Sequence, residues 1–78
     1  MFQDLLVTIT GSKDIYVENY KGLLDYKENL VALQGKKETI IIRGEGFLIE
    51  YFAVDGMKIS GCISSIEFCK TAKHSNRR

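Results

Sequence analysis

The chain has 78 residues and a formal net charge of +1, which allows one domain and gives no overall attraction to polyanions. Its apolar content of 45% is typical of a globular protein and argues against disorder along the whole chain. Residues 1–69 hold seven basic and ten acidic side chains, whereas residues 70–78 hold four basic side chains and no acidic one. We therefore expect a mildly acidic β domain over residues 1–69 that does not bind nucleic acid, and a basic, disordered tail over residues 70–78.

Short alternating segments separated by turn residues predict strands in the first half of the chain. Val7 and Ile9 alternate with threonines, and Ile15 and Val17 follow after a break at residues 11–14. Two further segments lie on either side of a turn at residues 27–29. Residues 18–34 are the best candidate for a helix, but they lack an apolar stripe at helical spacing and contain Gly22. We therefore expect strands here, with a helix as the weaker alternative.

The second half of the chain continues the pattern in residues 39–43, 47–52, 57–59 and 62–68, which glycine-containing turns separate. Turn signals spaced roughly 8–12 residues apart are typical of all-β proteins. We predict a small antiparallel β-sandwich of seven or eight short strands. A repeated figure of alternating apolar residues followed by glycine, in residues 7–11, 40–44 and 57–61, makes a short β-solenoid the alternative.

Several predicted strands are apolar on both faces. Ile40 and Ile42 point to one face while Ile41 points to the other, and residues 47–52 show the same property. A sheet in a small sandwich normally buries one face only. A homo-oligomer would cover the second face, and a closed, compact monomer is the alternative.

The chain lacks the spacing of a metal site. Cys62, Cys69 and His74 are the cysteine and histidine residues, and their irregular spacing does not match a zinc site. In one extended strand the two cysteines would lie roughly 23 Å apart, beyond disulfide range, so we expect reduced thiols. Reduced thiols are typical of a cytoplasmic protein.

No catalytic constellation is visible either. Glu50 and Glu67 are each flanked by apolar residues at the polar phase of an alternating strand, which predicts solvated side chains. Gly44 and Gly46 precede a predicted strand rather than a helix, so they do not form a phosphate loop. We therefore expect no catalytic residue, no cofactor and no small-molecule substrate.

The sequence shows no secretory signal, and no apolar run approaches the roughly 20 residues of a membrane-spanning helix. We expect a protein that is soluble or peripheral to a membrane. The basic tail is suited to anionic lipid or nucleic acid, although such an end is more often a solvated terminus.

One ordered set of segments resembles a known family. Residues 15–24, Ile-Tyr-Val-Glu-Asn-Tyr-Lys-Gly-Leu-Leu, are similar to the signature of the YabP/YqfC family of sporulation proteins, on its YqfC side. Later segments follow in the order of that family: Ile42-Arg43-Gly44, Phe47-Leu48-Ile49, Ile59-Ser60-Gly61-Cys62-Ile63 and Ile66-Glu67-Phe68. The resemblance covers about residues 5–69, and the chain departs from the family at Cys69 and in its basic tail.

The resemblance implies a small β-sandwich of endospore-forming bacteria, acting in the mother-cell cytoplasm without catalytic residues or cofactor. It also implies a membrane protein of the sporulation programme as partner. The residues themselves favour a protein-interaction module whose exposed apolar strip includes Tyr20 and Phe52, because aromatic anchors dominate binding energy. The alternative is a structural protein of the developing spore that self-assembles by pairing its sheet edges, because the chain has no proline to block such pairing.

Overall fold

The computed structural model describes residues 4–70, and in this range the chain forms strands and no helix. The prediction of an all-β, antiparallel protein is thus confirmed, and residues 18–34 contain strands rather than a helix. No helix within residues 4–70 is long and apolar enough to cross a membrane. The strands are β1 (Leu6–Thr10), β2 (Asp14–Glu18), β3 (Gly22–Lys27), β4 (Leu30–Gln34), β5 (Glu38–Phe52) and β6 (Gly56–Lys70).

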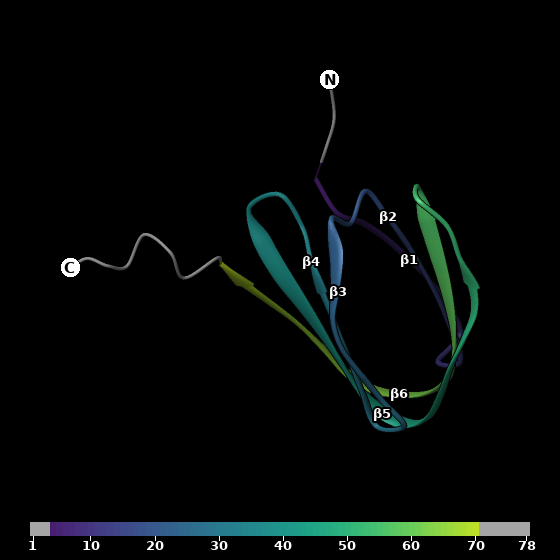
Figure 1. The fold of residues 1–78 in the computed structure, drawn as a ribbon. Coiled ribbons are helices and arrows are strands. Elements are labelled where there is room, and N and C mark those ends of the chain that lie inside the picture. Colours follow the sequence, from purple (N-terminus) through teal and green to yellow (C-terminus); the bar gives the residue numbers. More distant parts are fainter. Residues whose placement is uncertain (1–3, 71–78) are drawn as a thin grey trace.

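All six strands belong to one open sheet in the order β1-β2-β6-β5-β4-β3. The long β5–β6 hairpin forms its centre, the β1–β2 hairpin pairs with the first half of β6, and the β3–β4 hairpin pairs with the first half of β5. Figure 1 shows the long hairpin bent in the middle, so that the sheet has the shape of a U with two facing halves. Every pairing is antiparallel, so the alternative of a solenoid with stacked parallel coils is wrong.

The strand count differs from the prediction of seven or eight short strands in a sandwich. Residues 39–43 and 47–52, expected as separate strands, are the two halves of β5, and residues 57–59 and 62–68 are likewise parts of β6. Register shifts between Arg43 and Gly44 and between Glu45 and Leu48 bend the hairpin without ending its pairing. One folded sheet therefore stands where two separate sheets were expected.

Glycine is required at the bend because the two strands approach closely there. A Cβ atom at Gly44 would lie 1.9 Å from the carbonyl oxygen of Cys62, and one at Gly61 would lie 2.6 Å from Cδ1 of Phe47. Gly61 also has a φ of 143°, a conformation that L side chains rarely adopt. The ring of Phe47, 5% exposed, fills the space that the two glycines leave.

The turns of the two short hairpins satisfy the backbone at the bend. On the β5 side, Gly44 N donates to Asn29 O at 3.1 Å and Phe47 N donates to Glu28 O at 2.8 Å. On the β6 side, Gly61 N donates to Lys13 O at 3.0 Å and Ile63 N donates to Ser12 O at 2.9 Å. The turns thus replace the ladder partners that the bend removes, and buried amides are not left unpaired.

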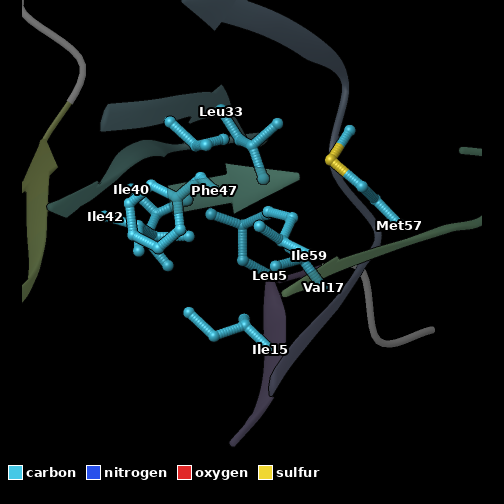
Figure 2. Close-up of a cluster of buried hydrophobic side chains, with 10 residues drawn as sticks. Leu5, Ile15, Val17, Leu33, Ile40, Ile42, Phe47, Met57 and Ile59 are labelled. Atoms are coloured by element: carbon cyan, nitrogen blue, oxygen red, sulfur yellow. The ribbon is translucent and has the colours of Figure 1, made fainter. Parts of the chain in front are cut away.

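The core lies between the two halves of the sheet, and Figure 2 shows its side chains converging from both. The fully buried members are Ile15, Val17, Val31, Leu33, Ile40, Ile42, Met57 and Ile59. The opposite faces of the same strands stay accessible, since Leu48 and Tyr51 are both more than half exposed. The apolar second face predicted from the sequence is therefore real, and no described residue covers it.

Lys70, predicted as the first residue of the tail, is the last residue of β6. The rest of the predicted tail, with His74, lies outside the described residues.

Candidate functional site

The structure brings together the two aromatic residues predicted to bind a partner. Tyr20 lies in the connection between β2 and β3, and Phe52 is the last residue of β5. Their rings stack with centroids 6.0 Å apart and an interplanar angle of 23°. Offset stacking of this kind contributes on the order of 1 kcal/mol beyond the area that the rings bury.

Backbone geometry next to Tyr20 sets the direction of its ring. Asn19 has a positive φ of 67°, which asparagine tolerates better than most residues, and its side-chain amide donates to Asp4 O at 3.0 Å. On the other side, Lys21 N donates to Gln34 O at 2.6 Å. The chain therefore turns at Asn19 and is anchored again at Lys21, so Tyr20 is held from both sides.

The hydroxyl of Tyr20 donates a hydrogen bond to the carbonyl oxygen of Ala53, in the turn between β5 and β6. Burial, assisted by the nearby carboxylate of Asp55, raises the pKa of this hydroxyl above its ordinary value. Tyr20 is therefore a neutral donor at physiological pH, and it ties the β5–β6 turn to the β2–β3 connection.

An open groove of about 660 Å³ runs along this aromatic pair. We call it the tip groove; it is lined by Tyr20, Lys21, Gly22, Phe52, Ala53 and Val54. Phe52 is 61% exposed and Val54 is 95% exposed, so the apolar lining is accessible. Lys21 is the charged side chain in the lining, and the groove otherwise offers apolar contact rather than reactive groups.

Sequence reasoning missed three neighbours of the aromatic pair. Val54 lies two residues after Phe52, in the turn between β5 and β6. Tyr16 of β2 and Tyr51 of β5 are both paired with Lys58 of β6, one on each side of it. The pair Tyr51-Phe52 just before the Asp55-Gly56 turn is the signal that could have revealed Val54 and Tyr51. Tyr16 could not have been assigned this way, because only the register places it beside Lys58.

The carboxylates considered for acid–base chemistry are solvated, as the alternation predicts. Glu50 forms an ion pair with Lys58 at 3.8 Å, and Glu67 forms one with Arg43 at 3.8 Å. All four side chains are between 43% and 57% exposed. Such exposed pairs contribute at most about 1 kcal/mol to stability and do not make a reactive centre.

A second cleft, also of about 660 Å³, lies at the bend of the long hairpin. We call it the bend cleft; its charged lining residues are Lys13, Asp14, Glu28 and Glu45, and Cys62 also borders it. Cys62 and Cys69 are both free thiols, opposite Glu45 and Thr39 in the register. Among residues 4–70, no three His, Cys, Asp or Glu side chains are grouped so that they could hold a metal ion.

Comparison with known proteins gives a family match and a bacterial relative. The sequence model of the YabP family matches residues 3–75. Over 65 residues the chain is 32% identical to "Uncharacterized protein YqfC" of Bacillus subtilis (strain 168), which covers 83% of this chain and 70% of that protein. No solved structure shows significant similarity to this chain.

Proposed function

Because the chain belongs to the YabP/YqfC family, as its sequence resemblance indicated, we propose that it acts in endospore formation as a non-enzymatic protein-interaction module. The site of action in this proposal is the mother-cell cytoplasm, and the partner is a membrane protein of the sporulation programme. The family resemblance supports the biological setting. The surface chemistry of the tip groove supports recognition of another polypeptide.

The stacked and accessible pair of Tyr20 and Phe52 is the observation that carries this proposal. Interfaces derive most of their binding energy from a few large aromatic anchors. Burying the exposed 61% of Phe52 would contribute about 2–3 kcal/mol at roughly 25 cal/mol per Å². Tyr20 is fixed by its hydrogen bond to Ala53, so its ring pays little entropy on binding.

The test is substitution of Phe52 by alanine, because this residue ends β5 and its side chain is mostly exposed rather than buried in the core. We expect Phe52→Ala to lose capture of the membrane-protein partner from sporulating cells, with an unchanged circular dichroism spectrum. Ile9→Ala is the matched control, since Ile9 is similarly exposed at 50% but lies on β1, outside the tip groove. Equal capture by the parent protein and Phe52→Ala would contradict the assignment of the tip groove.

A further inference from the structure

The second half of β6 offers an unpaired sheet edge. From Ser65 to Lys70 the strand pairs with β5 on one side, and no other described strand or turn pairs with its outer side. Further back, Ile63 N already donates to Ser12 O, so the β1–β2 turn closes the edge at that point. The open stretch is therefore Ser64–Lys70, and unpaired backbone of this kind accepts another extended chain.

The other edges of the sheet are better protected. Along the second half of β5, the hydroxyl of Tyr26 accepts from Ile49 N at 3.3 Å and donates to Phe47 O at 3.4 Å. Strand β3 is interrupted by a bulge between Leu23 and Asp25, and β1 has five residues only. Bulges, short strands and covering side chains all prevent pairing with a second chain.

The side chains along the open stretch suit pairing with a copy of itself. Ile66 and Phe68 lie opposite the buried residues Ile42 and Ile40, so they share the apolar, core-facing side of the sheet. Phe68 is nevertheless 51% exposed, because no described strand follows β6 on that side. An identical strand running antiparallel would place apolar side chains against apolar ones, as an isologous contact requires.

We propose that two copies of this chain form a twofold dimer through Ser64–Lys70, with Ile66 of each copy opposite Phe68 of the other. This register uses the whole open stretch and pairs Ser65 with Cys69 across the interface. It brings the Glu67 carboxylates of the two copies together at the twofold axis. Each carboxylate is paired with Arg43 of its own copy at 3.8 Å.

The dimer is tested by measuring mass in solution by analytical ultracentrifugation of the full chain. We expect a concentration-dependent dimer that Phe68→Lys converts to a monomer, because a lysine facing the core side of the joined sheet would be buried against apolar groups. Ile9→Lys, a change at a similarly exposed residue of β1, should leave the dimer intact. A parent protein that stays monomeric at millimolar concentration, or a dimer that Phe68→Lys does not weaken, would overturn the proposal.

Cross-linking tests the register without relying on a core substitution. In a Cys62→Ser background, Ser65→Cys should form a disulfide with Cys69 of the other copy under mild oxidation. The same two residues within one copy lie roughly 13 Å apart along the strand, too far for a disulfide. Thr8→Cys on β1 should give no comparable cross-link. If the two variants cross-link equally, the register is wrong.

Phe52→Ala, a change in the tip groove, should not alter the dimer. This inference and the tip-groove proposal therefore fail independently.

Discussion

Gly44→Ala is the substitution for which the structure makes the sharpest prediction about stability. The added methyl group would lie 1.9 Å from the backbone oxygen of Cys62 and 2.7 Å from Cζ of Phe47. The neighbouring atom is backbone, so the strand itself must shift by more than 1 Å to restore ordinary contact, roughly the difference from a 3.4 Å separation. That shift would disturb the hydrogen bond from Gly44 N to Asn29 O and the packing of Phe47.

The expected loss follows from these two contacts. A disrupted backbone hydrogen bond accounts for about 1 kcal/mol, and a displaced, buried phenylalanine accounts for up to about 3–5 kcal/mol. We therefore expect the free energy of unfolding to fall by about 3 kcal/mol or more. A chain of this length has a total of about 4–12 kcal/mol, so the loss is a large share of it. The melting temperature should fall by at least about 12 °C.

Urea and thermal unfolding followed by far-ultraviolet circular dichroism provide the assay, and tyrosine fluorescence is a second probe because the chain has no tryptophan. Gly22→Ala is the matched control, since a Cβ atom at Gly22 meets nothing within 4 Å and its φ is not in the left-handed region. That control should be neutral or slightly stabilising. The free energies of unfolding of Gly44→Ala and the parent could instead differ by less than about 1 kcal/mol, roughly the contribution of one hydrogen bond. In that case the bend does not require glycine at position 44.

Three other substitutions test other parts of the molecule. Tyr20→Phe should lose about 1 kcal/mol of stability with the hydrogen bond to Ala53. Above about pH 10 the parent should lose stability faster than Tyr20→Phe. The reason is that the pKa of the Tyr20 hydroxyl is raised in the folded chain, so the unfolded chain loses the hydroxyl proton first. Parallel pH profiles of the two proteins in urea titrations would contradict this. Ile42→Ala should cost about 2–5 kcal/mol, because Ile42 is fully buried between the sheet halves, whereas the half-exposed Leu48→Ala should lose far less in the same measurement. Tyr26→Phe should leave the fold intact but increase light scattering at high concentration, since it removes the hydroxyl that hydrogen-bonds the backbone of β5. Scattering no higher than that of the parent would show that Tyr26 does not protect this edge from pairing.

Local sequence patterns determine most of the strands. Val7 and Ile9, or Ile15 and Val17, alternate with polar residues, and this period of two sets both the extended backbone and the face that each side chain takes. Turn residues at positions 11–14 and 27–29 then mark the hairpins that the structure contains. These features are readable because each depends on residues only a few positions apart.

The tip groove was only partly predictable from the sequence. Tyr20 and Phe52 could be chosen as large aromatics at strand ends, but their stacking depends on the turn at Asn19 and on the closing of the β5–β6 hairpin. Val54 and Tyr51 belong to the same exposed end, although neither was selected from the sequence. Contacts of this kind join residues far apart in the chain, so no local pattern reports them.

The sequence by itself determined that the protein is all-β and that the carboxylates within its strands are solvated. Both features follow from alternation and turn residues, which are local properties of the chain. Only the tertiary structure decided that β5 and β6 each continue through a glycine bend, so that one sheet folds over its own core. Gly44 and Gly61 look like turn residues in the sequence, and the reason for them is the close approach of Cys62 and Phe47 from the neighbouring strand. That long-range packing also left the edge of β6 and the tip groove accessible, since a chain of this size cannot cover both faces and every edge of its sheet.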